Sequence, residues 1–536
     1  MTKTVLLFVL ISFLCSCSAG SPAKYYVSSS AGNDANNGRT ESTPWKTISK
    51  VNGRHFSPGD SVFFKKGDVW RETLSVSGSG NKATYIFFGS FGTGMNPIIM
   101  GSEPVTGWVS VDNNVWKSKN SFINPEEFHA DIHFKEKDNS ISWGNYVPGM
   151  LSLQKEHDWY WNDNYIYIWS ASDPASNYQS VEVPQRYSCI DTQYNEYIHF
   201  KGIDVFYAEY VGIDDFSRHS DNQNKTGLKI ENCEIGYIGG ISSSPSGFGI
   251  GVVYSDLVIR DCKIHHCGRR GISLDNYGYG FTARNALIEE NIFYGGYHTT
   301  ALDCNTGASG YSANWDGIVF RRNLVYEEEA RQMPYSSNQV FVQRYGNTSL
   351  KNIYIYSNVF KFPGGAGISL EGVDSIFIYN NTFYDSHPSV KTCYQIFLDN
   401  YPTNIKIKNN IFYSLSTINS RGKCIGAGSF NPLEVEADFN LYYRIEQTLS
   451  ILGLNNQYYM ASRFPIPEGW ETHGVKGDPL FLSGDDYRLQ SKSPAAGKGV
   501  SLRTKDGAAI IEKDYNGNKY NDPPSIGAFE YVPSAR

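Results

Sequence analysis

The chain has 536 residues, of which 40% are hydrophobic, 19% are charged and 51 are glycine. This composition excludes an intrinsically disordered chain and favours a folded, turn-rich protein with many strands. The formal net charge is −7. Because no stretch of clustered lysine or arginine accompanies it, we expect no nucleic-acid partner.

The N-terminus predicts export. An apolar run over residues 5–14 is too short to span a bilayer and is typical of a signal peptide. Leu14, Ser16 and Cys17 resemble a bacterial lipobox, so we expect residues 1–17 to be a lipoprotein signal and Cys17 to be lipidated. The protein would then sit on the outer membrane or cell surface. The alternative is an ordinary signal cut near Ala19, which would give a periplasmic or extracellular protein.

Residues 18–102 are predicted to form an N-terminal cap and the first structural repeats. A strand is expected around residues 25–28 and another around residues 58–64. Between them, Thr43 is predicted to N-cap a short amphipathic helix whose first residue is Pro44. Such a helix would cover the open end of an elongated fold.

Residues 103–190 interrupt the repeat and predict a β-hairpin-rich excursion. Aromatic and aliphatic residues over 159–161 and 165–169 flank the turn residues 162–164. We expect these aromatic residues to serve mainly in packing, although an exposed sugar-binding platform is the alternative.

Residues 191–445 carry a repeat that predicts a right-handed parallel β-helix. In each copy an apolar residue is followed three places later by Cys or Asn and two places after that by another apolar residue. Successive Cys/Asn positions are 29, 29, 32, 35, 23 and 29 residues apart; they are Cys233, Cys262, Asn291, Asn323, Asn358, Asn381 and Asn410. Periods of this length indicate a solenoid, here built from strands and turns. The asparagines are expected to form a buried hydrogen-bonded ladder, and the two cysteines to be core residues in the same slot.

Residues 446–536 are expected to be the C-terminal coils and cap, ending in a closing strand over residues 525–531. Together with the opening YYVSSSAGNDANNG…PWKTI, the PGDSVFFKKG turn and the closing DPLF…DYRLQSKSPAAGKG…SIGAFEY, the repeat resembles the pectin-lyase-like superfamily of parallel β-helix proteins. It is especially similar to members that bacteria export to digest polysaccharides. The resemblance implies an all-β fold and a carbohydrate substrate, but the superfamily includes lyases, hydrolases, epimerases and noncatalytic adhesins.

A second strand in each coil predicts a column of outward polar side chains. Strand alternation places Asp275, Asp303, Gln343, Glu371 and Asp399 level with one another on one face. Carboxylates of Asp275 and Asp303 would then lie about 5 Å apart, and those of Asp303 and Glu371 about 9–10 Å apart, close to the separations in retaining and inverting glycosidases. The alternatives are a Ca²⁺ site and a solvated row of turn residues.

Three basic residues flank this column. Arg270 and His298 come just before their strands, and Arg344 follows Gln343. We expect Arg270, His298, Arg344, Gln343 and Asp399 to contact substrate.

The sequence therefore predicts a polysaccharide-cleaving enzyme, with a glycoside hydrolase favoured. Asp275, Asp303 and Glu371 are its predicted catalytic carboxyls. A Ca²⁺-dependent polysaccharide lyase is one alternative, and a noncatalytic glycan-binding surface protein is the other. We expect a monomer with no obligatory cofactor, Ca²⁺ being the one candidate.

Overall fold

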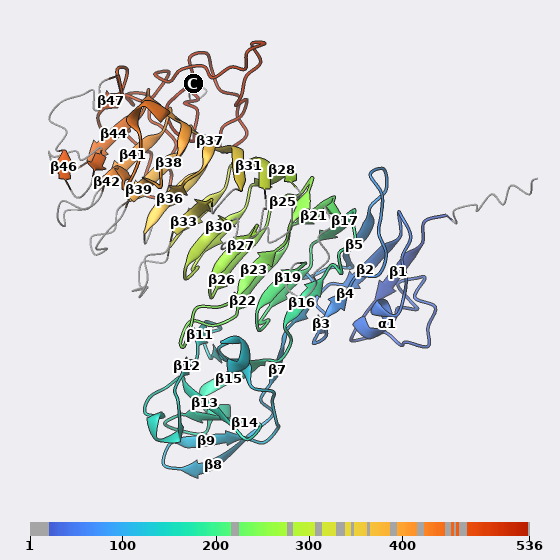
Figure 1. Ribbon diagram of the computed structural model, residues 1–536. Coiled ribbons are helices and arrows are strands. Elements are labelled where there is room, and N and C mark those ends of the chain that lie inside the picture. The colour runs from blue at the N-terminus through green and yellow to red at the C-terminus, as the bar shows by residue number, and fades with distance from the viewer. Residues whose placement is uncertain are drawn as a thin grey trace, which may run out of the picture.

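The structure is a computed structural model that describes residues 21–215, 225–275, 282–305, 314–327, 338–344, 348–361, 365–385, 394–414, 423–444, 452–454, 457–459 and 469–533. The predicted signal and Cys17 lie outside these residues. Three long parallel sheets wind into a β-helix, which confirms the predicted fold class (Figure 1). Within the described residues, sheets A, B and C contain 12, 12 and 10 strands.

Each coil passes through the three sheets in the same order. Sheet A contains β1 (Lys24–Val27), β2 (Ser61–Lys65), β5 (Ile86–Phe91), β17 (Ile198–Lys201), β21 (Leu228–Glu231), β25 (Val258–Arg260), β28 (Thr282–Glu289), β31 (Asn314–Arg321), β34 (Ser349–Tyr356), β37 (Asp374–Tyr379), β40 (Thr403–Lys408) and β43 (Val435–Asp438). Sheet B contains β3 (Val69–Trp70), β6 (Ile98–Met100), β18 (Asp204–Phe206), β22 (Glu234–Ile238), β26 (Lys263–Cys267), β29 (Ile292–Tyr294), β32 (Leu324–Tyr326), β35 (Val359–Lys361), β38 (Thr382–Asp385), β41 (Ile411–Ser414), β44 (Leu441–Arg444) and β47 (Val475–Lys476). Sheet C contains β4 (Leu74–Ser75), β16 (Ser188–Asp191), β19 (Val211–Asp214), β23 (Phe248–Gly251), β27 (Arg270–Ser273), β30 (Thr299–Asn305), β33 (Asn338–Gln343), β36 (Ala366–Glu371), β39 (Tyr394–Asp399) and β42 (Lys423–Ala427).

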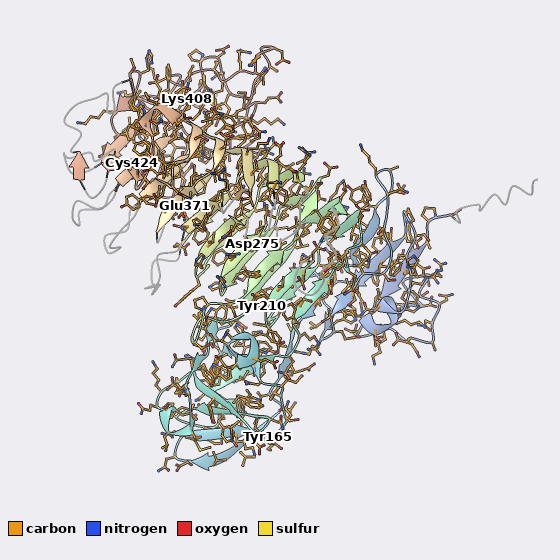
Figure 2. The ribbon with its side chains drawn as sticks, in the orientation of Figure 1. Tyr165, Tyr210, Asp275, Glu371, Lys408 and Cys424 are labelled. Carbon is orange, nitrogen blue, oxygen red and sulfur yellow. The ribbon has the colours of Figure 1, made fainter. Side chains whose placement is uncertain are left out.

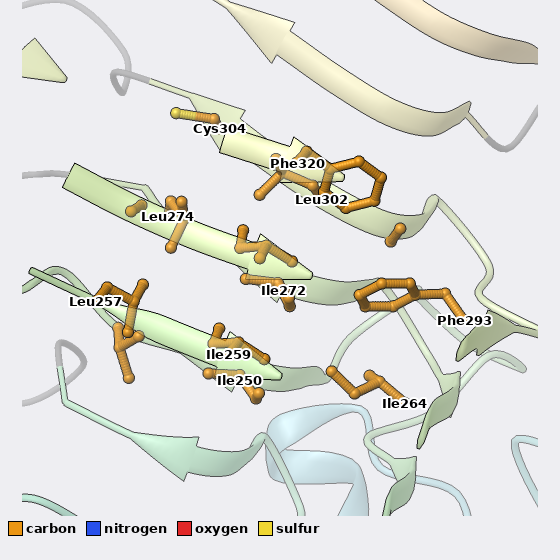
Figure 3. Close-up of a cluster of buried hydrophobic side chains, with 14 of the residues drawn as sticks. Ile250, Leu257, Ile259, Ile264, Ile272, Leu274, Phe293, Leu302, Cys304 and Phe320 are labelled. Carbon is orange, nitrogen blue, oxygen red and sulfur yellow. The ribbon is translucent and has the colours of Figure 1, made fainter. Parts of the chain in front are cut away.

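The core is a column of apolar side chains that point into the coils. On sheet C, Ile250 pairs with Ile272, and Ile272 pairs with Leu302 on the next strand (Figure 3). All three side chains are fully buried. The alternation of inward apolar and outward polar residues therefore determines which side chains of sheet C face outward.

The predicted asparagine ladder stands at the turn between sheets A and B. The side-chain amide of each asparagine donates to the carbonyl oxygen of the next at 2.9–3.1 Å, through Asn291, Asn323, Asn358, Asn381, Asn410 and Asn440. The same oxygen accepts the backbone N–H of the preceding asparagine, so buried polar groups are paired from coil to coil. Cys262 continues the row, and its backbone N–H donates to Asn291.

The two ends of the β-helix differ from the prediction. Helix α1 (Ile48–Asn52) covers the N-terminal end, but its N-cap is Thr47 rather than Thr43. Pro44 therefore lies before the helix, because Trp45 is held in a β-bridge to Val27. The segment 525–531 forms no strand.

The C-terminal segment lies along the ladder corner instead of closing the end. The N–H of Gly527 donates to the Asn409 carbonyl, and that of Ala528 donates to the Thr382 hydroxyl. Glu471 terminates the ladder, because its carboxylate accepts the Asn440 amide at 2.7 Å. Burial raises the pKa of Glu471 to about 7.

The excursion, residues 102–184, interrupts the connection from sheet B to sheet C (Figure 1). Its elements are β7 (Ser102–Pro104), β8 (Trp108–Asp112), β9 (Val115–Ser118), η1 (Pro125–Phe128), β10 (His133–Glu136), β11 (Ile141–Trp143), β12 (Asn145–Tyr146), η2 (Met150–Ser152), β13 (Asp158–Asn162), β14 (Tyr165–Trp169), α2 (Pro174–Asn177) and β15 (Tyr178–Pro184). Strands β13 and β14 form the predicted hairpin, and Trp159 is fully buried in the excursion's own core.

The excursion is fixed to the β-helix by a buried carboxylate. Asp131 accepts the backbone N–H groups of Ile241 at 2.6 Å and Ser242 at 3.0 Å.

The remaining short elements are β20 (Lys225–Thr226) with β24 (Tyr254–Ser255), η3 (Pro432–Glu434), and β45 (Leu452–Leu454) with β46 (Gln457–Tyr459). Within the described residues, no helix has the length and apolar character needed to cross a membrane.

Candidate active site on sheet C

Sheet C carries the predicted polar column, but with a different register. Gln343 pairs with Glu371, and Glu371 pairs with Asp399. The residue level with Gln343 on the preceding strand is Asn305 rather than Asp303. Asp303 instead pairs with Ser273 on one side and with Phe341 on the other. The predicted alignment of Asp303 with Asp275 is therefore wrong.

A bulge in β30 accounts for one residue of this two-residue shift, and the pairing of Arg270 with Thr299 instead of His298 accounts for the other. The pair between Arg270 and Thr299 is followed by the pair between Ile272 and Leu302, so β30 holds one extra residue over this interval. Bulges of this kind re-aim side chains and are frequent beside active sites. Asp303 and Asp275 consequently lie diagonally on neighbouring strands, an arrangement in which Cα atoms are about 8 Å apart.

Arg270 contacts both carboxyls. Its Nη1 pairs with the Asp275 carboxylate, and its Nε lies 2.9 Å from Oδ2 of Asp303. Asp303 and Asp275 are 0% and 1% exposed. The guanidinium donates a hydrogen bond to Asp275 and forms an ion pair with Asp303, which suits a pair of carboxyls that must act on one bond. Arg270 was predicted to contact substrate, and the structure gives it this bridging position.

The environment of Asp303 favours its protonated form. Burial raises the pKa of Asp303 to about 7, with the Asp275 charge adding to the rise and the Arg270 charge opposing it. Oδ2 accepts the Thr299 hydroxyl at 3.0 Å, whereas Oδ1 is buried without a hydrogen-bond partner among the described residues. A carboxyl that is protonated near neutral pH and keeps one oxygen uncommitted can act as a general acid.

His298 lies at the rim of this cluster. Its Nδ1 is 3.8 Å from Asp303 Oδ2 and 3.1 Å from the Thr299 hydroxyl, and its side chain is 40% exposed. Burial, together with the positive charges of Arg270 and Arg269, lowers the pKa of His298 to about 4. A neutral imidazole that touches both Asp303 and solvent suits the predicted role in substrate contact.

Glu371 does not belong to the cluster. It is two strands and two residues away from Asp303, roughly 12 Å between Cα atoms, so the predicted separation of 9–10 Å is too short for the observed register. Its carboxylate accepts the Gln343 side-chain amide, and burial raises its pKa. Asp399 accepts the backbone N–H of Ser429 at 2.7 Å, and Arg344 is exposed. Gln343, Asp399 and Arg344 therefore remain predicted substrate contacts on the same sheet, beyond the acidic pair.

Glu327 is a buried carboxyl that sequence reasoning overlooked. It is only 8% exposed and accepts the Thr300 hydroxyl on the bulged strand β30. It stands directly after β32, where the chain leaves sheet B towards sheet C.

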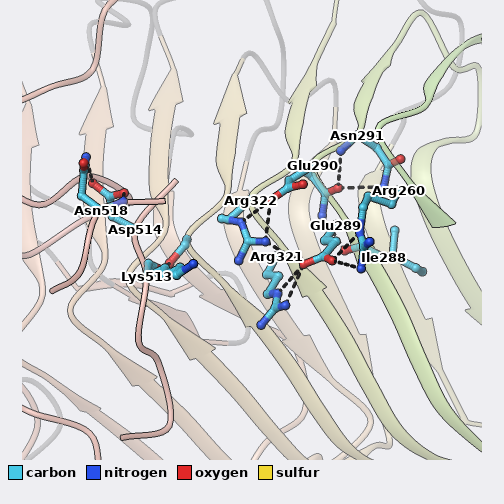
Figure 4. A network of polar contacts seen from close by, with 12 residues as sticks. Arg260, Ile288, Glu289, Glu290, Asn291, Arg321, Arg322, Lys513, Asp514 and Asn518 are labelled. Carbon is cyan, nitrogen blue, oxygen red and sulfur yellow. Dashed lines mark hydrogen bonds and ion pairs between the residues drawn. The ribbon is translucent and has the colours of Figure 1, made fainter. Parts of the chain in front are cut away.

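Glu289 on sheet A belongs to a structural ion-pair network, which differs from the candidate site on sheet C. Glu289 accepts Arg260, Arg321 and Arg322 side chains, each at 2.7 Å (Figure 4). Burial alone would raise the pKa of Glu289. The arginine hydrogen bonds and charges outweigh burial and hold this pKa below its usual value. The pKa of Glu289 is thus lowered, whereas that of Asp303 is raised to about 7. A strongly raised carboxyl pKa is more typical of a functional site than of a structural network.

The described residues contain no group of three or more His, Cys, Asp or Glu side chains arranged to hold a metal ion. The calcium site that the acidic column suggested would therefore need ligands from elsewhere in the chain or from substrate. Asp275 and Asp303 both contact the positively charged Arg270 guanidinium.

Comparison with known proteins supports the fold more strongly than the chemistry. No protein-family model matches the chain. A lacto-N-biosidase of Bifidobacterium longum is 46% identical over 50 residues, which is 9% of this chain and only 3% of that protein. This chain therefore matches a small part of a much longer relative.

Among solved structures, XylC in complex with xylose aligns with 95% of this chain and 98% of its own, at a TM-score of 0.53 and 14% identity. A GH136 lacto-N-biosidase from Eubacterium ramulus aligns with 85% of this chain and 67% of its own, at a TM-score of 0.44 and 13% identity. The XylC alignment spans nearly the whole of both chains, so the shared fold includes more than the repeating coils. Likeness at this level of identity establishes the fold alone.

Proposed function

We propose that this protein hydrolyses glycosidic bonds of a polysaccharide at the Arg270, Asp275 and Asp303 cluster on sheet C. The observation that carries the proposal is the bulged strand that brings two buried carboxyls onto one guanidinium, with one oxygen of Asp303 unpaired within the described residues. Two carboxyls flanking one bond are the usual machinery of glycoside hydrolysis. The full-length fold likeness to XylC, which was solved with xylose, and the short match to a lacto-N-biosidase point to the same substrate class.

The geometry favours a retaining reaction. Carboxyls that meet at one guanidinium leave little room for a water molecule between them, and a separation of about 5–5.5 Å is typical of retaining enzymes. Asp303 gives its proton to the glycosidic oxygen as that bond breaks, and the Asp275 carboxylate bonds to the anomeric carbon. Asp303 then takes a proton from water, whose oxygen displaces Asp275. Arg270 orients both groups, and His298 positions the sugar.

The N-terminal sequence supports a location outside the cytoplasm for this activity. We propose that the protein is exported, anchored through a lipid on Cys17 and active as a monomer at the cell surface. A membrane-anchored hydrolase would act on glycans outside the cell. Labelling of the protein by a radioactive fatty acid in the producing cell, lost in Cys17→Ala, tests the anchor.

Digestion of a polysaccharide panel tests the activity. Homogalacturonan, alginate, xylan and β-glucan are incubated with the parent protein, with Asp303→Asn and with Asp506→Asn, which changes an exposed carboxylate in the tail. We expect new reducing ends from the parent and Asp506→Asn, and a loss of about 100-fold or more in Asp303→Asn. Products absorbing near 235 nm would indicate a lyase instead, and binding without cleavage would indicate a glycan-binding protein.

A further inference from the structure

A chain of aromatic rings connects the excursion to the acidic cluster. The ring of Phe128 in the excursion meets the Tyr187 ring edge-on, with 5.2 Å between the ring centroids. The centroids of Tyr187 and Tyr210 are also 5.2 Å apart, and their ring planes are inclined by 30°. Tyr210 meets Phe248 at 5.1 Å, and the Arg270 guanidinium lies over Phe248 at 5.4 Å. The series therefore ends at the residue that bridges Asp275 and Asp303.

These rings occupy the same edge of sheet C as His298. Tyr187 and Tyr210 come directly before β16 and β19, as His298 comes directly before β30. Backbone hydrogen bonds run from Tyr210 N–H to the Tyr187 carbonyl and from His298 N–H to the Arg269 carbonyl. At about 4.8 Å per coil, Tyr210 lies three coils, roughly 14 Å, from His298. Figure 2 shows Tyr210 between the excursion and Asp275.

Packing alone does not account for all of these rings. Phe248 is buried, but Phe128, Tyr187 and Tyr210 stay partly exposed, although the hydrogen bonds of nearby Asp131 already fix this part of the excursion to the β-helix. Two tyrosine rings repeat along the helix axis at nearly the coil spacing. Partly exposed tyrosines with an apolar ring and a polar tip are suited to a ligand that presents both kinds of surface.

We infer that Phe128, Tyr187 and Tyr210 form a remote binding subsite that stacks against pyranose rings of an extended glycan chain. A pyranose offers an apolar C–H face to an aromatic ring and hydroxyl groups to the tyrosine tips. The roughly 14 Å interval from His298 corresponds to several sugar units, so the substrate is a polymer or long oligosaccharide that follows the helix axis. This inference rests on the proposed function for the location of the cleaved bond.

Affinity electrophoresis in gels containing homogalacturonan, alginate, xylan or β-glucan tests the subsite separately from catalysis. All variants are made in an Asp303→Asn background, so that bound glycan is not cut. Tyr210→Ala is expected to weaken retardation about tenfold and Phe128→Ala to weaken it less, because an aromatic anchor commonly controls at least that factor in affinity. The matched control is Tyr401→Ala, which removes a tyrosine that is 65% exposed at another turn of the helix.

Three results would overturn the inference. They are the absence of retardation of the parent in every gel, equal retardation of the parent and Tyr210→Ala, and a shift in the unfolding midpoint of Tyr210→Ala that accounts for the weaker binding. In the active background, the loss of kcat/KM in Tyr210→Ala should grow with the length of the oligosaccharide, whereas a purely structural role would lower it equally for every length. Retained cleavage in Asp303→Asn would refute the proposed catalytic cluster without affecting the binding result.

Discussion

Removal of the Arg270 guanidinium is expected to destabilise the protein in a pH-dependent manner. In Arg270→Gln the carboxylates of Asp275 and Asp303, which are 1% and 0% exposed, lose their shared positive charge. Breaking a buried ion pair in this way costs about 3–5 kcal/mol of unfolding free energy. The penalty should be largest at pH 8. At pH 5 it should be smaller, because Asp303, whose pKa already stands at about 7, takes up a proton.

Urea unfolding followed by tryptophan fluorescence at both pH values measures this effect. Arg284→Gln is the control, since it breaks an exposed pair with Asp316 whose arginine side chain is 56% exposed and should cost about 1 kcal/mol or less. The double variant Arg270→Gln with Asp303→Asn should recover part of the loss at pH 8. A loss in Arg270→Gln below about 1 kcal/mol at pH 8, or an equal loss at both pH values, would refute the buried-charge reasoning.

Three further predictions concern the ladder, the pH profile and metal dependence. Asn381→Ala leaves several buried ladder groups unpaired and should lower the free energy of urea unfolding by about 3–5 kcal/mol. The control Asn404→Ala removes an exposed side chain and should cost about 0.5 kcal/mol or less. Equal losses in the two variants would contradict the ladder's role. If Asp303 is the general acid, kcat/KM should fall about tenfold per pH unit above about pH 7, and activity increasing above pH 8 would exclude this role. The stability that its raised pKa contributes should already be lost as the pH rises from about 4 to about 7, and should change little above that. Cleavage by the carboxyl pair should be unchanged after exhaustive treatment with EGTA, and a loss restored by Ca²⁺ would favour the lyase alternative.

The sequence predicted the fold well because a solenoid repeats its physical requirements. Each coil must bury the same inward positions and pair the same buried amides, so Asn291 to Asn410 recur at the spacing of one coil. The resemblance to known parallel β-helix proteins pointed the same way. The helix N-cap was misplaced because Thr43 followed by Pro44 is a stronger local signal than Thr47. The β-bridge of Trp45, which settles the matter, depends on a contact distant in sequence.

The candidate site was predicted less accurately because it depends on an irregularity. Alternation along a strand places Asp303 outward, but nothing in the letters TTALD distinguishes a regular strand from one with an extra residue. The bulge moved Asp303 away from the column of Gln343 and Glu371 and towards Arg270. Glu327 was missed for a related reason, since its burial against Thr300 depends on a contact between neighbouring strands that the sequence does not reveal.

Chemical rescue tests the proposed catalytic pair most directly. Asp275→Ala is assayed on the cleaved polysaccharide with and without sodium azide, alongside Glu327→Ala. The proposed mechanism predicts that azide restores cleavage in Asp275→Ala alone and yields a glycosyl azide of inverted anomeric configuration, because the small anion fills the place of the lost carboxylate. Rescue of Glu327→Ala instead, or full activity of Asp275→Ala without azide, would contradict it.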